Sequence, residues 1–160
     1  MAFPQNKDEI EIIMITRREG LLTKVGHDLR LRVQPNSLQV EGEDFSGDIS
    51  VNAIELQGAL VNGVVEDMSS GDSSKILKTL RKKVFNEKRH PKVHFSGTFG
   101  DTVEISLDIN GVKNPLILTK SGQTWIGEVD YRKFGIAQVS ALFGTLKVSP
   151  LVEIKVSLTV

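Results

Sequence analysis

The chain alternates most strictly over Val103-Glu104-Ile105-Ser106-Leu107-Asp108-Ile109-Asn110-Gly111. Every second side chain is aliphatic and the side chains between are polar, which is the period of a β-strand with one buried and one solvated face. Asn110-Gly111 suits a type I′ hairpin turn, although a bulge within a longer bent strand would also use a glycine there. The stretch therefore predicts part of an antiparallel sheet.

Further strand patterns lie on both sides of this stretch. We expect strands over 9–16, 27–34, 38–40, 45–53, 54–65, 93–99, 116–119, 124–131 and 151–160. Gly58 and Gly63 are expected to mark bulges or bends in the strand that contains them. A run of short strands separated by turns is typical of a sandwich or a barrel. The chain length suits one domain, so we expect residues 1–160 to form a single all-β domain.

One segment has helical periodicity instead. Its apolar residues form a stripe about 100° wide and are Ile76, Leu77, Leu80 and Val84. The residues that can cap the helix are Asp72, Ser73 and Ser74. The helix must end before Pro91, because the residue before a proline is disfavoured in helical conformation. The sequence predicts one amphipathic helix over 73–88, with its apolar face toward the sheet.

The composition excludes several classes of site. The chain has 20 basic and 20 acidic residues, so the net charge gives no drive toward nucleic acid, and we expect no nucleic-acid partner. Cysteine is absent, which excludes disulfides and thiolate metal sites. No apolar run reaches the about 20 residues that a membrane-spanning helix needs. The N-terminus lacks the pattern of a secretory signal, so we expect a cytoplasmic location.

Positive charge is concentrated in one segment. Residues 75–99 contain eight basic side chains and only one acidic side chain, Glu87. Lys75, Lys78, Arg81 and Lys82 lie off the apolar stripe of the predicted helix. Since cationic amphipathic helices dock on membrane surfaces, we expect Lys78, Arg81 and Lys82 to contact a membrane surface or anionic headgroups. The alternative is an ordinary solvated helix face.

The three histidines do not form a convincing catalytic or metal site. His27-Asp28 could supply a general base and its carboxylate partner, but neighbours on a strand point to opposite faces. His90 and His94 have helical metal-site spacing, yet Pro91 ends the helix and an extended chain separates them by about 13 Å. We expect no catalytic residue, no metal and no cofactor. A hydrolase or isomerase that uses His27 is the third hypothesis for the function.

Several segments follow one another in an order that points to a known family. They are Ile10 to Thr16, Gly26-His27-Asp28-Leu29, Phe85-Asn86, His90-Pro91-Lys92-Val93-His94-Phe95, Leu107 to Leu116 and Tyr131-Arg132-Lys133-Phe134-Gly135-Ile136. Together they resemble the YceI-like domain family over nearly the whole chain. The resemblance implies an antiparallel lipocalin-like β-barrel of about eight strands, which in some members holds long polyisoprenoid lipids. The segment from Gly20 to Asp28 resembles a cytoplasmic-type branch of the family, which has no signal peptide.

The inward face of such a barrel is the main candidate site. Barrels of about eight strands are either filled by side chains or hold one small ligand. We expect ligand contacts from Ile12, Met14, Leu29, Leu31, Val51, Phe95, Phe99, Ile105, Leu107, Trp125 and Phe143. The same inward face is expected to include Ile10, Val33, Ile49 and Ile154. Each of these residues also fits the alternative role of ordinary core.

The leading functional hypothesis is non-enzymatic. The protein would bind, carry or sequester an apolar small molecule such as a polyisoprenoid or a fatty acid. The alternative is an interaction or scaffold module whose barrel is filled by its own side chains. The sequence leaves a homodimer open as well.

Overall fold

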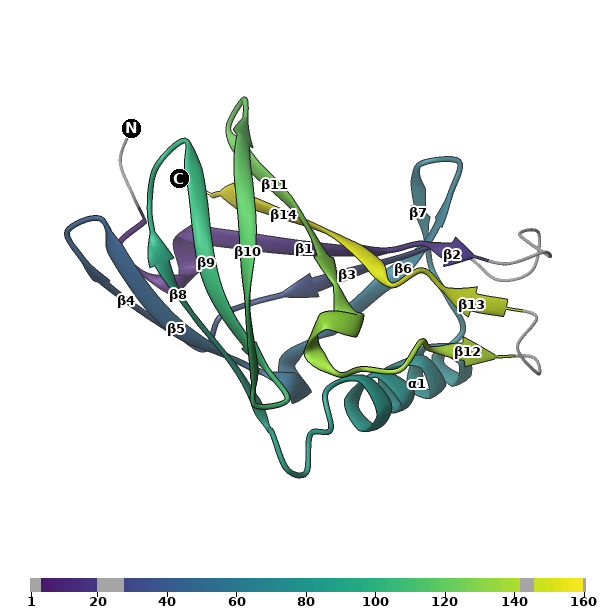
Figure 1. Cartoon of the computed structure of the whole chain (residues 1–160). Coiled ribbons are helices and arrows are strands. Elements are labelled where there is room, and N and C mark those ends of the chain that lie inside the picture. Colours follow the sequence, from purple (N-terminus) through teal and green to yellow (C-terminus); the bar gives the residue numbers. More distant parts are fainter. Residues whose placement is uncertain (1–3, 20–27, 142–145, 160) are drawn as a thin grey trace.

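The computed structural model describes residues 4–19, 28–141 and 146–159, and Figure 1 shows a fold dominated by strands. The main sheet has eleven strands, in the order β4 (Ser37–Glu41), β5 (Asp44–Ser50), β8 (Lys92–Thr98), β9 (Thr102–Ile109), β10 (Val112–Ser121), β11 (Thr124–Asp130), β14 (Leu151–Leu158), β1 (Ile10–Thr16), β3 (Asp28–Val33), β6 (Glu55–Val61) and β7 (Val64–Glu66). A smaller sheet has the order β12 (Ser140–Ala141), β13 (Leu146–Val148) and β2 (Arg18–Glu19). All the pairings in both sheets are antiparallel.

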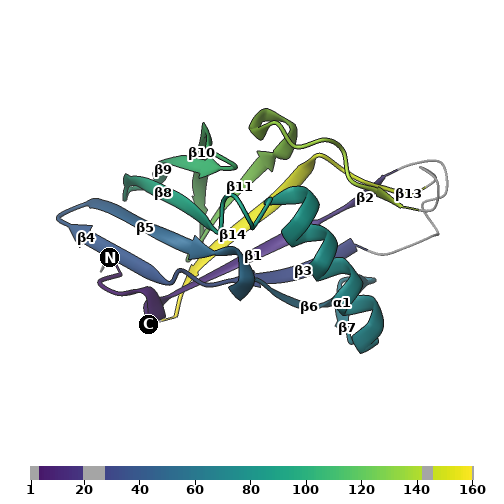
Figure 2. The ribbon, with the colours of Figure 1, turned by 90° about the horizontal axis from the view of Figure 1, so that it is seen from below.

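The main sheet is curled, with its concave face toward the core (Figures 1 and 2). The predicted barrel is not closed by hydrogen bonds, because within the described residues no ladder joins the end strands β4 and β7. The chain instead crosses between the two sides of the sheet three times, at residues 34–36, at the 3-10 turn η2 (Val51–Ala53) and over residues 67–91 between β7 and β8. Pro35 lies in the first crossing and has no N–H to donate to a ladder. The described residues form fourteen strands, more than the predicted eight.

The alternation that predicted the sheet is confirmed on β9. Val103, Ile105, Leu107 and Ile109 are buried, whereas Thr102, Glu104 and Ser106 are exposed. The hairpin after β9 is confirmed too, since Ile109 pairs with Val112 and the two turn residues between them have positive φ, 57° and 74°. Positive φ at both positions is what a type I′ turn requires.

The predicted strand over 54–65 is in fact a hairpin of β6 and β7. The turn is Asn62-Gly63, with φ of 52° and 80°, so Gly63 is a turn residue and not a bulge. The bulge at Gly58 is confirmed, because the pairing of β6 with β3 shifts beside it. A side chain at Gly58 would come within 2.3 Å of the carbonyl oxygen of Glu66.

The strand predicted over 45–53 also differs from the structure, since β5 ends at Ser50. Val51 instead begins the turn η2, and its N–H donates a 3.0 Å hydrogen bond to the carbonyl oxygen of Pro91. The strand prediction failed here because Val51 and Ala53 continue the apolar alternation of β5. Alternation alone does not show where a ladder stops.

The helix begins and ends earlier than the predicted 73–88. It consists of α1 (Ser70–Thr79) and a π-helical turn, η3 (Leu80–Val84). The side chain of Ser69 caps it by accepting a hydrogen bond from the N–H of Asp72, so the cap lies before the predicted cap residues. The helix lies at the end of the sheet where β2, β12 and β13 also lie (Figure 1).

Two further 3-10 turns are η1 (Lys7–Glu9) and η4 (Tyr131–Phe134). Within the described part of the chain, no helix is long and apolar enough to cross a membrane.

Candidate ligand-binding cavity

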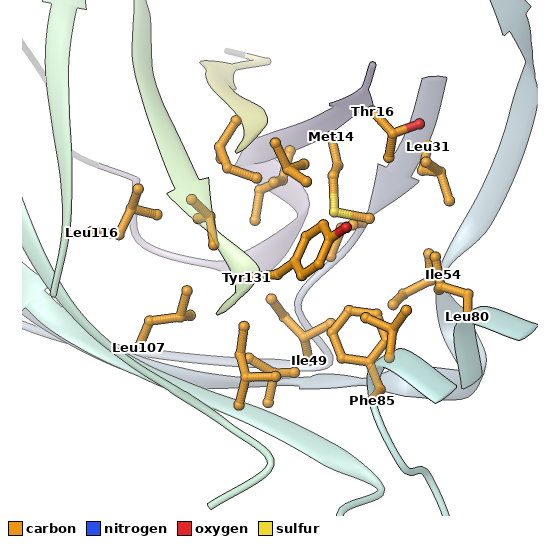
Figure 3. A pocket seen from close by; sticks show the side chains of 18 of the residues that line it. Met14, Thr16, Leu31, Ile49, Ile54, Leu80, Phe85, Leu107, Leu116 and Tyr131 are labelled. Atoms are coloured by element: carbon orange, nitrogen blue, oxygen red, sulfur yellow. The ribbon is translucent and has the colours of Figure 1, made fainter. Parts of the chain in front are cut away.

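The curled sheet and the helix enclose a cavity of about 780 Å³ (Figure 3). Ligand pockets of proteins usually start at about 300 Å³, so this cavity has room for a sizeable molecule. Its lining side chains are mostly aliphatic and aromatic, and they come from most strands of the main sheet and from the helix. Figure 3 shows Leu107 and Leu116 on one side of this space and Leu31, Leu80 and Phe85 on the other.

The structure places most of the sequence-predicted ligand residues on this lining. Those that line the cavity are Ile12, Met14, Leu29, Leu31, Phe95, Phe99, Ile105, Leu107 and Trp125. The other expected inward residues, Ile10, Val33, Ile49 and Ile154, line it as well. Val51 is fully buried but is not among the lining residues, since it lies in η2 and not on a strand. Phe143 lies outside the described residues.

Aromatic rings form part of the wall, and glycines make room for them. The ring centroid of Phe45 lies 4.4 Å from that of Phe99 and 6.2 Å from that of Phe95. A Cβ atom on Gly97 would come within 2.8 Å of the Phe45 ring, and one on Gly47 within 2.6 Å of the Phe95 ring. The two glycines therefore allow these rings to lie flat over neighbouring strands.

Trp125 is held in place from two directions. Its indole Nε1–H donates a 3.0 Å hydrogen bond to the carbonyl oxygen of Gly100. The ammonium of Lys120 lies 5.7 Å from the ring centroid, within the range of a cation–π contact. Because Trp125 is the one tryptophan of the sequence and lines the cavity, its fluorescence is a natural reporter of cavity occupancy.

Tyr131 was not among the predicted ligand residues, yet it lies within the cavity wall (Figure 3). Its hydroxyl donates a 2.7 Å hydrogen bond to the carbonyl oxygen of Val148 and accepts one of 3.3 Å from the N–H of Val139. Burial raises the pKa of Tyr131 above its usual value, so the hydroxyl is neutral and able to donate. Sequence reasoning missed it because a lone tyrosine at the end of a strand does not show which way it points.

The helix contributes a part of the lining that its periodicity had indicated. Ile76, Leu80 and Val84 of the predicted apolar stripe line the cavity. The sequence predicts only that this stripe faces the sheet. Because the cavity lies between the helix and the sheet, the same residues are part of the site.

Charged side chains line the cavity at one end. They are Arg17, Arg18, Asp72, Lys75, Lys83 and Lys147. They belong to the β1–β2 segment, to the helix and to β13, which lie at the same end of the sheet (Figure 1). The rest of the lining is apolar apart from Thr16, Thr79, Tyr131 and Ser140. One end of the cavity is therefore charged, and the rest of its wall is mostly apolar.

The residues predicted to contact membranes do not line the cavity. Lys78 and Lys82 are exposed on the helix. Arg81 is half-buried, and its guanidinium donates a 3.2 Å hydrogen bond to the carbonyl oxygen of Asn52. Arg81 thus attaches the helix to η2, while membrane contact by the three residues stays a prediction.

His90 and His94 line one small pocket together with Asp108. His27 lies outside the described residues, so its catalytic role stays a hypothesis. Its neighbour Asp28 is engaged by the preceding strand, since it accepts a 2.8 Å hydrogen bond from the N–H of Arg18 and pairs with Arg17 at 3.2 Å. His94 is hydrogen-bonded through Nδ1 to Asp48. No cluster of three or more metal-ligating side chains forms in the described ranges.

Comparison with known proteins gives one family and a shared fold. The family model described as the YceI-like domain matches residues 22–160. A search of curated proteins finds no match. The crystal structure of BcnA from Burkholderia cenocepacia is similar with a TM-score of 0.56 and 15% identity, and the match covers 97% of this chain and 98% of that chain.

A second solved structure is a polyisoprenoid binding domain from Saccharophagus degradans implicated in plant cell wall breakdown. It matches with a TM-score of 0.53 and 9% identity, over 93% of this chain and 91% of that chain. At these identities the two structures show a common fold.

Proposed function

The chain belongs to the YceI-like domain family, and on that basis we propose that it binds an apolar molecule in the cavity, to carry or sequester it. The observation that carries this proposal is the apolar cavity of about 780 Å³ inside the curled sheet. In this proposal the sheet acts as a lipocalin-like barrel, with an isoprenoid or fatty acyl chain along its interior. The polyisoprenoid ligand named for the Saccharophagus degradans domain supports this ligand class.

Desolvation of the ligand would supply most of the affinity. Each buried methylene contributes about 0.8 kcal/mol, so a chain of about ten methylenes gains about 8 kcal/mol. Part of that gain is offset by the lost freedom of the ligand. Micromolar binding would therefore need a chain longer than about ten methylenes, but no polar contact along the apolar part of the cavity.

A self-filled barrel that serves only as a scaffold is the less favoured alternative. Protein interiors are usually close-packed, with few voids larger than a water molecule. A single void of about 780 Å³ departs from that rule and would be costly if it served no purpose.

The direct test is to extract gently purified protein with organic solvent and to identify the extract by mass spectrometry. We expect a long-chain isoprenoid or acyl lipid in a near-stoichiometric amount. As a second measurement, lipid-free protein should bind dodecanol with a change in Trp125 fluorescence. The proposal fails if the extract contains no lipid and dodecanol does not bind.

A further inference from the structure

The charged end of the cavity does not suit a ligand that is apolar throughout. Five of the six charged side chains that line it are cationic, namely Arg17, Arg18, Lys75, Lys83 and Lys147, and only Asp72 is acidic. We propose that the natural ligand is an amphiphile with an anionic headgroup, a carboxylate or a phosphate, which is held at this end. This inference rests on the proposed function and adds the headgroup class to it.

Three of the cations are available to a ligand. Arg17 is already paired with Asp28 at 3.2 Å and with Glu153 at 3.5 Å. Lys75, Lys83 and Lys147 are exposed and have no ion-pair partner within the part of the chain that the structure describes. A lysine side chain is long and flexible, so its ammonium can follow a headgroup while its stem covers apolar surface.

The helix presents two of these lysines on its cavity side. Lys75, Thr79 and Lys83 follow one another at intervals of four residues, and all three line the cavity. Residues at this spacing lie on one helix face. Lys78 and Lys82 belong to the same helix and carry the same charge, but they do not line the cavity.

Thr16 is an independent indication of a polar ligand group at this end. It is only 9% exposed, lines the cavity and directly precedes Arg17 and Arg18. Because the side chain lines the cavity, a ligand can reach its hydroxyl. A carboxylate or phosphate oxygen accepts the O–H hydrogen bond that this hydroxyl is able to donate.

The test compares four probes with the same chain and different headgroups: dodecanoate, dodecyl phosphate, dodecanol and dodecylamine. Binding is followed by Trp125 fluorescence, without vesicles and below the micelle concentration of each probe. We expect at least one of the two anions to bind roughly tenfold more tightly than dodecanol, and dodecylamine to bind most weakly. The preference for the anion should shrink as salt is raised, because partly exposed ion pairs are screened. The stronger of the two anions distinguishes a carboxylate from a phosphate.

Two charge-reversed variants locate the effect. Lys75→Glu/Lys83→Glu should weaken binding of the preferred anion roughly tenfold, since each reversal removes an attraction and adds a repulsion. The affinity of this variant for dodecanol should stay within about twofold of that of the wild type. The matched control, Lys78→Glu/Lys82→Glu, makes the same charge change on the same helix and should leave both affinities nearly unchanged. Circular dichroism verifies that both variants fold.

The outcomes separate the two proposals. If dodecanol binds as tightly as both anions, the anionic headgroup is wrong while hydrophobic binding stands. If the control variant weakens anion binding as much as the cavity-side variant, the effect comes from overall charge and the assignment to the cavity mouth is wrong. If none of the four probes binds, the proposed function itself fails.

Discussion

Single polar side chains organise the charged end of the cavity, and Tyr131 is the clearest case. Its hydroxyl connects η4 to Val139 and Val148 through two hydrogen bonds. Tyr131→Phe keeps the ring but leaves the carbonyl of half-buried Val148 and the N–H of half-buried Val139 without this partner. We expect the free energy of unfolding to fall by about 1–3 kcal/mol, measured by chemical denaturation. An unchanged stability would contradict this role.

Asp130 makes the stability of the same segment depend on pH. Its carboxylate accepts hydrogen bonds from the Arg132 guanidinium at 2.9 and 3.0 Å and from the Arg132 N–H at 3.0 Å. The guanidinium contacts hold the pKa of Asp130 below its usual value of 3.8. A lowered folded-state pKa means that the ionised carboxylate stabilises the fold above the usual value, and this contribution is lost as the pH falls through the folded-state pKa.

We therefore expect Asp130→Asn to be less stable than the wild type at neutral pH. The difference in unfolding free energy should shrink progressively below about pH 4. Denaturation curves at several pH values measure it. A difference that stays constant down to pH 2 would show that this carboxylate is not the group responsible.

A substitution at Thr16 should affect ligand binding without lowering the stability of the fold. Thr16→Val replaces the hydroxyl of a cavity-lining side chain by a methyl group, so it should leave the free energy of unfolding unchanged or raise it. The same variant should weaken binding of dodecanoate or dodecyl phosphate, because the headgroup loses a hydrogen-bond donor. A clear loss of stability in thermal denaturation would mean that the hydroxyl has a structural partner.

Among the elements, β8 shows how a glycine shapes the aromatic wall. A Cβ on Gly97 would meet both the Phe45 ring and the carbonyl oxygen of Glu104 at 2.8 Å. Gly97→Ala should therefore destabilise the fold by about 1–3 kcal/mol. Gly100→Ala is the control, since its nearest contact would be an ordinary 3.4 Å. Equal stabilities of the two variants in denaturant would contradict the proposed close packing.

The elements also show what local sequence patterns determine. The period-2 pattern of β9 and its Asn110-Gly111 turn could be predicted because each depends only on neighbouring residues. A second Asn-Gly pair, Asn62-Gly63, has the same hairpin pattern, although the prediction of one strand over 54–65 places a bulge or bend there. The helix limits were missed because Ser69, which caps it, lies before the apolar stripe.

At the scale of the whole molecule, the sequence predicted which residues face inward but not the size of the space between them. An alternating strand has the same pattern whether its apolar face meets other side chains or a cavity. Phe45 illustrates the limit, since its place over Gly97 follows from the pairing of β5 with β8. The charged end could not be predicted either, because Arg17, Lys75 and Lys147 are brought together only by the fold.

The curl of the sheet is likewise a property of the whole molecule. The resemblance implies a lipocalin-like barrel, whereas within the described residues the ladder runs in an open order from β4 to β7. The three crossings, at 34–36, at η2 and over 67–91, connect the two sides of the sheet without hydrogen-bonding its end strands. Occupancy of the cavity by a ligand therefore tests the proposed function more directly than closure of the sheet does.

The most direct test fills the cavity from one strand and compares it with a matched change outside. Ile105 is buried and lines the cavity from β9, whereas Ile117 on neighbouring β10 is 55% exposed. Dodecanol affinity is measured by displacement of a neutral fluorescent dye from the wild type, Ile105→Trp and Ile117→Trp. The account predicts that Ile105→Trp weakens binding at least tenfold and that Ile117→Trp binds like the wild type. Equal affinities in all three proteins would contradict it.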